Sequence, residues 1–202
     1  MELAPPPLTL IIERTLYSSN QAWLECCHSF LPLLREHPKL ALQLRSCSDQ
    51  ARDEKIWLHE LLPPHPRIRM NGLPELPRPA HLREQDLKAG IKIPFSASVH
   101  DEAAIDRATS LGASYLHLGP LYAPKSKSTS PIGEARFIEL LAYTSLPIVA
   151  VGGIDHTNIE RVFELGAQGA ALIGSVLLHS APERYCLRLL NQLDHLLSDE
   201  QF

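Results

Sequence analysis

Several residues that could bind phosphate stand where apolar runs of the sequence end. Gln43 and Arg45 lie two apart in LALQLR, so both side chains point to one face of a strand. An arginine among apolar neighbours is costly to bury without an anionic partner. Gly152-Gly153 and Gly174-Ser175 end two later apolar runs, and glycine lets backbone N–H groups approach phosphate oxygens closely. Alternatively, these glycines only form tight turns between strand and helix.

A long polar loop offers further phosphate ligands. Residues 119–133 read GPLYAPKSKSTSPIG, which is longer than most connections in a compact domain. Two lysines and four hydroxyl residues crowd into this loop, and a lysine supplies a point charge to an anion while hydroxyls supply donors. The alternative is an ordinary solvated polar loop.

The elements that must position these residues follow from the hydrophobic pattern. Apolar runs predict strands at 8–13, 40–45, 67–71, 80–84, 93–99, 114–119, 147–153 and 169–175. Helical spacing appears at 20–36, 48–62, 101–111, 134–144, 156–166 and 180–197. The segments 72–79 and 85–92 are too short for good helices, and 72–79 is also rich in proline. Eight strands with alternating connections predict an α/β fold, a single (βα)8 TIM barrel over 1–202, and an open doubly wound sheet is the alternative.

Composition limits the classes of partner. The chain has 202 residues, a formal net charge of −4 and four cysteines without metal-binding spacing. A chain without a basic surface is not expected to bind nucleic acid, and no apolar run reaches the roughly 20 residues that a membrane span needs. The N-terminal apolar run is too short for a signal peptide and lacks a basic region before it. We expect a cytoplasmic protein, and the sequence leaves open whether it forms a homodimer.

Two stretches carry a specific resemblance. GASYLHLGPLYAPKSKS and LPIVAVGGIDHTNIERVFELGAQGAALIGSVL are similar to the second half of the thiamin phosphate synthase and TenI family. The first half matches more weakly, through QLR at 43–45, MNG at 70–72, HLREQD at 81–86 and SVH at 98–100. The resemblance covers roughly 40–180 and implies a TIM barrel of thiamin biosynthesis that binds a small phosphorylated heterocycle.

The resemblance also implies roles for individual residues. The family synthase joins an aminomethyl-pyrimidine pyrophosphate to a thiazole phosphate and releases pyrophosphate with the help of Mg²⁺. By this resemblance Gln43 and Arg45 hold pyrophosphate, Asn71 stands beside the first metal ligand, and Asp86 is the second metal ligand. The remaining matches are Ser98 in the strand-five motif, Ser126 and Lys127 on the phosphates, and Gly153, Ile173 and Gly174 at the thiazole phosphate.

Departures from the synthase pattern favour the other branch. Gly72 stands where the synthase has an aspartate, and Cys47 stands where it has a lysine. Losing a metal carboxylate weakens an Mg²⁺ clamp on departing pyrophosphate. MNG and SVH instead resemble TenI, whose members aromatise a thiazole phosphate tautomer by proton transfer without a metal, although Pro120 replaces a histidine that this branch can carry. We therefore expect a TenI-like tautomerase with no cofactor. The alternatives are a synthase using Mg²⁺ and Asp86, or a non-catalytic phosphate-ligand-binding protein.

The proton carrier is the least determined part of the expected site. His100 ends the fifth predicted strand and could be a general base, because an imidazole titrates near neutral pH. It could equally be a structural histidine. We expect His81 and His117, inside predicted strands, to be residues of the barrel wall. Asp86 could orient a substrate amine without metal or cap a short helix. The catalytic candidates are therefore His100 and Lys127.

Overall fold

Eight parallel strands close into a barrel. The computed structural model describes residues 3–47, 50–123 and 130–199. In them the strands are β1 (Leu8–Glu13), β2 (Leu40–Arg45), β3 (Ile68–Asn71), β4 (Ala80–Leu82), β5 (Phe95–Val99), β6 (Tyr115–Leu118), β7 (Ile148–Val151) and β8 (Gly169–Leu172). Each strand pairs with the next along the chain, and β1 also pairs with β8, which closes the ring. The predicted (βα)8 TIM barrel is confirmed, and the open sheet is excluded.

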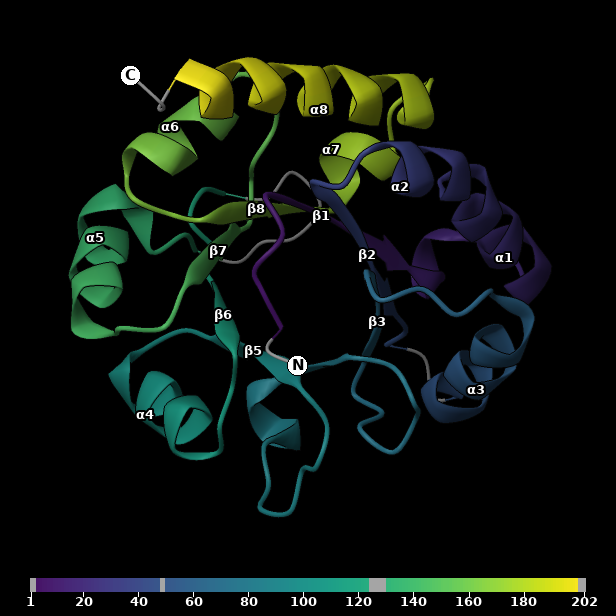
Figure 1. Cartoon of the computed structure of the whole chain (residues 1–202), viewed down its shortest axis with the longest axis horizontal. Coiled ribbons are helices and arrows are strands. Elements are labelled where there is room, and N and C mark those ends of the chain that lie inside the picture. Colours follow the sequence, from purple (N-terminus) through teal and green to yellow (C-terminus); the bar gives the residue numbers. More distant parts are fainter. Residues whose placement is uncertain (1–2, 48–49, 124–129, 200–202) are drawn as a thin grey trace.

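Helices surround the barrel (Figure 1). They are α1 (Asn20–Ser29), α2 (Leu31–Glu36), α3 (Ala51–Leu61), α4 (Glu102–Ser110), α5 (Gly133–Tyr143), α6 (Ile159–Glu164), α7 (Gly174–Leu177) and α8 (Pro182–Asp199), with short 3-10 turns η1 (Arg14–Leu16) and η2 (Glu84–Asp86). No α-helix follows β3 or β4 before β5, as the short segments 72–79 and 85–92 predicted. The described residues contain no helix long and apolar enough to cross a membrane.

At two places the number or type of elements differs from the sequence prediction. The helical pattern at 20–36 is two helices, since α1 ends before Phe30 and α2 begins at Leu31 with a proline in its first turn. Proline lacks an N–H and is suited to start a helix, not to continue one. The last apolar run, 169–175, is a strand only as far as Leu172, and Gly174 opens α7.

The strands present different residues to their two faces. Alternate positions, such as Leu8, Leu10 and Ile12 of β1, are buried in the large core between barrel and helices. Among the described residues, the apolar cluster on the inner face is small and lies around Ile11 and Tyr115. Many of the other buried inner positions are polar: Thr9, Gln43, Arg69, Asn71, His81, Ser96 and His117. Polar side chains inside a barrel need partners, so this face is where a site is expected.

Candidate active site

A cavity of about 840 Å³ opens at the carboxyl ends of the strands. Its volume lies in the range of small-molecule sites. The structure brings most of the predicted site residues to its lining: Gln43, Arg45, Asn71, Ser98, His100, Gly152, Gly153, Ile173, Gly174 and Ser175. Ser126 and Lys127 lie outside the described residues. Asp86 lines a separate hollow of about 250 Å³ together with Gly72 and Gln85.

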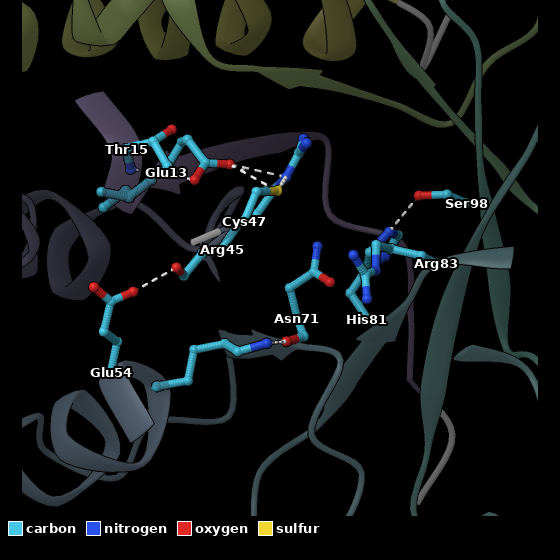
Figure 2. A network of polar contacts seen from close by, with 12 residues as sticks. Glu13, Thr15, Arg45, Cys47, Glu54, Asn71, His81, Arg83 and Ser98 are labelled. Atoms are coloured by element: carbon cyan, nitrogen blue, oxygen red, sulfur yellow. Dashed lines mark hydrogen bonds and ion pairs between the residues drawn. The ribbon is translucent and has the colours of Figure 1, made fainter. Parts of the chain in front are cut away.

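Arg45 has its anionic partner within the chain. Its Nε lies 2.9 Å from Oε2 of Glu13, which is its register partner on β1, and also donates to Sγ of Cys47 at 3.2 Å (Figure 2). The carboxylate orients the guanidinium at the end of β2, and Arg45 lines the cavity. The sequence indicated that Arg45 needs an anionic partner. It did not identify Glu13 as that partner, because the pair depends on the register of β1 and β2.

His81 forms the floor of the cavity and holds Ser98. Its Nδ1 lies 2.9 Å from Oγ of Ser96 and its Nε2 lies 2.7 Å from Oγ of Ser98. Burial, with help from the Arg69 and Arg45 charges, lowers the pKa of His81 to about 3, so the ring is neutral at physiological pH. The ring centroids of His81 and His117 are 4.3 Å apart, and burial also lowers the pKa of His117 well below its usual value. Both histidines lie in the barrel wall, where we expected them, and both also line the cavity.

Arg69 is a buried cation that the sequence reasoning missed. It precedes Asn71 by two residues on β3, so both point into the barrel, and its guanidinium lies 5.6 Å from the ring centroid of Tyr115. Its Nη2 donates to the carbonyl of Ala4 at 3.4 Å, while among the described residues Nε and Nη1 have no hydrogen-bond partner. A guanidinium without a carboxylate partner makes the inside of the barrel electrostatically positive, which favours an anionic ligand. The alternation of strand residues could have revealed it.

His100 is oriented by a backbone carbonyl. Its Nδ1 lies 2.5 Å from the oxygen of Gly119. A carbonyl oxygen only accepts, so Nδ1 carries the hydrogen and the neutral ring has its lone pair on Nε2. His100 lines the cavity and can therefore act as a base toward a bound ligand.

The glycines at the end of β7 are required by packing. Gly152 and Gly153 have φ of 101° and 65°, in the left-handed region. A Cβ at Gly152 would lie 2.5 Å from Cβ of Pro120, and one at Gly153 would lie 2.7 Å from the backbone of Tyr122. The tight-turn alternative therefore accounts for these two glycines by itself. Both glycines also line the cavity.

Asp86 is paired with Arg83. Nε of Arg83 donates to Oδ2 at 2.7 Å and Nη2 donates to Oδ1 at 3.0 Å, so both carboxylate oxygens are engaged. Residues 87–94 form no helix, so Asp86 is not a cap. A Cβ at Gly72 would lie 3.4 Å from Oδ2 of Asp86 and 3.5 Å from Nζ of Lys55. Position 72 thus faces Asp86, but it supplies no ligand.

The residues around Asp86 do not fit an Mg²⁺ site. Mg²⁺ is bound by carboxylates and demands octahedral oxygen ligands. The Asp86 carboxylate binds the Arg83 guanidinium, and Glu75 of the same hollow is paired with Arg52. Lys55 places a further cation beside Asp86. The part of the chain that the structure describes contains no group of three or more His, Cys, Asp or Glu side chains that could hold a metal. The metal role that the resemblance implied for Asp86 is therefore not supported by the geometry.

The closed barrel, with a cavity of this size at the carboxyl ends of its strands, has the architecture of the (βα)8-barrel class, in which ligands bind in the loops that follow the strands. The sequence model of the family described as thiamine monophosphate synthase matches residues 80–176. A thiamine-phosphate synthase of Koribacter versatilis is 30% identical over 154 residues, which cover 68% of this chain and 73% of that protein. The chain belongs to this family.

Two further relatives define the extent of the likeness. A thiamine-phosphate synthase of Methanoculleus marisnigri is 41% identical over 85 residues, 41% of this chain and 40% of that protein, so the match spans less than half of that relative. A thiamine phosphate pyrophosphorylase from Pyrococcus furiosus has a similar structure, with a TM-score of 0.71 and 19% identity, covering 94% of this chain and 96% of that one. At this identity the structural likeness shows the fold alone.

Proposed function

We propose that the chain is a thiamin phosphate synthase, which joins an aminomethyl-pyrimidine pyrophosphate to a thiazole phosphate and releases pyrophosphate. The relatives reported above carry the synthase name, which favours this alternative over the tautomerase that the sequence pattern favoured. In the reaction a carbon–nitrogen bond forms as the carbon–oxygen bond to pyrophosphate breaks, and the electron pair leaves with the pyrophosphate.

The observation that carries the proposal is a cavity lined by arginines on one side and by glycines at strand ends on another. Arg45 and Arg83 line it at the ends of β2 and β4, and Gly153 and Gly174 line it at the ends of β7 and β8. In the closed ring β4 lies opposite β8, and β2 lies two strands away from β8. Pyrophosphate on the arginine side and thiazole phosphate on the glycine side would leave the two reacting atoms between them.

The floor of the cavity would bind the uncharged part of the substrates. Gln43 and Ser98 offer hydrogen-bonding groups there, and the neutral His81 fixes the Ser98 hydroxyl. Apolar side chains such as Ile11 and Ile173 complete the lining and exclude water from a ring. These residues would hold the pyrimidine in line for displacement of its pyrophosphate.

The test is a coupling assay with both substrates. We expect formation of thiamin phosphate and stoichiometric release of pyrophosphate, both followed by chromatography, and no product when either substrate is left out. Absence of coupling, with the thiazole phosphate tautomer converted to its aromatic form, would replace the synthase by the tautomerase. Binding without either conversion would leave a phosphate-ligand-binding protein.

The tautomerase remains a second candidate because of His100. Its Nε2 lone pair is directed by the contact between Nδ1 and Gly119, as a proton-transfer base requires. In this case His100→Asn should slow aromatisation by about 10²–10⁴-fold, the usual contribution of a general base. Affinity for thiazole phosphate should change little, because it is assigned to the glycine side. An undiminished rate in the variant would exclude His100.

A further inference from the structure

Arg83 stands between Asp86 and the main cavity. Arg83 lines the large cavity, whereas Asp86 lines the small hollow beside it. The two contacts to the Asp86 carboxylate use Nε and one hydrogen of Nη2, and the side chain of Arg83 is 46% exposed. A guanidinium has five N–H donors, so Nη1 and the second hydrogen of Nη2 remain for another acceptor.

Lys55 adds a second cation at the same place. The residue is only 7% exposed, and its Nζ donates to the carbonyl of Asn71 at 2.8 Å. The same Nζ lies 3.5 Å from where a Cβ of residue 72 would be. The ammonium of Lys55 and the guanidinium of Arg83 thus both lie beside position 72 and Asp86. Both cations repel a divalent metal ion and attract an anion.

The same arrangement occurs twice at this side of the cavity. Arg45 is held by Glu13 at the end of β2, and Arg83 is held by Asp86 after β4 (Figure 2 shows the first pair and the position of Arg83). Each carboxylate fixes one edge of its arginine. The N–H groups on the other edge are then preorganised for a ligand, which reduces the entropy lost on binding.

We propose that Arg83, positioned by Asp86, binds the pyrophosphate group of the substrate directly and does so without a divalent metal ion. Arg45 and Arg83 form a pair of guanidiniums on the pyrophosphate, and Asp86 is a positioning residue and not a metal ligand. Arginine suits this role because its planar N–H groups match phosphate oxygens in bidentate geometry. The identity of the anion rests on the proposed function, whereas the metal-independent anion site does not.

The test measures pyrophosphate binding by calorimetry in the presence of EDTA. We expect the parent protein to bind pyrophosphate without metal, and Arg83→Ala to bind it about 10- to 100-fold more weakly, the range of a lost charge-assisted contact. Arg83→Gln, which keeps more of the side chain, should show the same loss. Arg136→Ala is the matched control, because Arg136 is an exposed arginine of α5 that pairs with Glu102 and Glu139 away from the cavity. It should bind like the parent.

The positioning role of Asp86 is tested by its effect on the binding of pyrophosphate by Arg83. Asp86→Asn should weaken pyrophosphate binding in EDTA, and Asp86→Glu should restore part of it because a carboxylate is again present. Titration with Mn²⁺, followed by electron paramagnetic resonance without pyrophosphate, should show no bound ion in the parent. A parent that binds pyrophosphate only with metal, or an Mn²⁺ site lost in Asp86→Asn, would overturn the proposal.

The two proposals fail separately. If Arg83→Ala binds pyrophosphate as the parent does in EDTA while coupling of the substrates proceeds, the role of Arg83 is wrong and the synthase stands. If pyrophosphate binding depends on Arg83 but no thiamin phosphate forms, the anion site stands and the synthase is wrong.

Discussion

At the scale of single residues, the burial of His81 makes the stability of the protein depend on pH. Its pKa is about 3 in the folded protein and 6.5 in an unfolded chain. Between these values the unfolded chain binds more protons, so the free energy of unfolding rises with pH across this window. Stability is therefore lost as the pH falls from about 6.5 toward 3, and His117 acts in the same direction.

We predict that His81→Asn makes stability less dependent on pH. One histidine contributes a slope of at most about 1.4 kcal/mol per pH unit to the free energy of unfolding. Urea unfolding at pH 4.5 to 7 should give a shallower slope for the variant than for the parent. His28→Asn, at an exposed position on α1, is the control and should keep the parent's slope. Equal slopes in parent and His81→Asn would show that His81 is protonated in the folded state.

At the scale of elements, Arg67 joins the end of α2 to the sheet. It lies just before β3, and its Nη1 donates to the carbonyls of His37 and Leu40, both at 2.6 Å. Its Nη2 donates to the carbonyl of Leu34 at 2.5 Å. The last carbonyls of a helix accept no hydrogen bond from within the helix. A cation that donates to them therefore stabilises the end of the helix.

We predict that Arg67→Ala lowers the free energy of unfolding by about 1–3 kcal/mol, because buried carbonyls lose a charged donor. Chemical denaturation measures this change. Arg35→Ala, at an exposed position in the last turn of α2, is the matched control and should change stability by less than about 0.5 kcal/mol. Equal small effects in both variants would mean that water replaces the guanidinium at these carbonyls.

At the scale of the whole molecule, closure of the barrel depends on a close approach at Gly169. A Cβ there would lie 2.2 Å from the carbonyl oxygen of Pro6, in the segment that leads into β1. The next residue, Ala170, donates its N–H to the carbonyl of Pro7 at 3.0 Å. This contact joins the last strand to the first, so it closes the ring.

We predict that Gly169→Ala destabilises the protein by about 1–3 kcal/mol, the usual cost of overpacking. Without a clash the same change should stabilise by about 0.4–1 kcal/mol, since it restricts the unfolded chain. The sign of the change in thermal or urea unfolding therefore isolates the clash. Hydrogen exchange should also be faster at the Ala170 amide than in the parent. A stabilised variant would mean that the segment before β1 moves away at no cost.

The sequence by itself determined the barrel and the position of most candidate site residues at one cavity. Local periodicity sets where a strand begins, so β1 and β2 have the bounds that their apolar runs predicted. Parallel strands in a closed barrel all end at one face, which is why residues such as Gln43, Ser98 and Gly174 could be assigned to one cavity in advance.

Only the tertiary structure decided which charged groups meet. The pairing of Arg45 with Glu13 depends on the register of β1 and β2, and Arg69 is buried only because the strands close around it. The sequence alone does not distinguish an Asp86–Arg83 pair from an Asp86 metal site, because both need a carboxylate at that position. The path of the loop after β4, with Lys55 reaching in from α3, placed cations there. Charges interact through space at a few ångströms, and closure of the ring, not spacing along the chain, sets those distances.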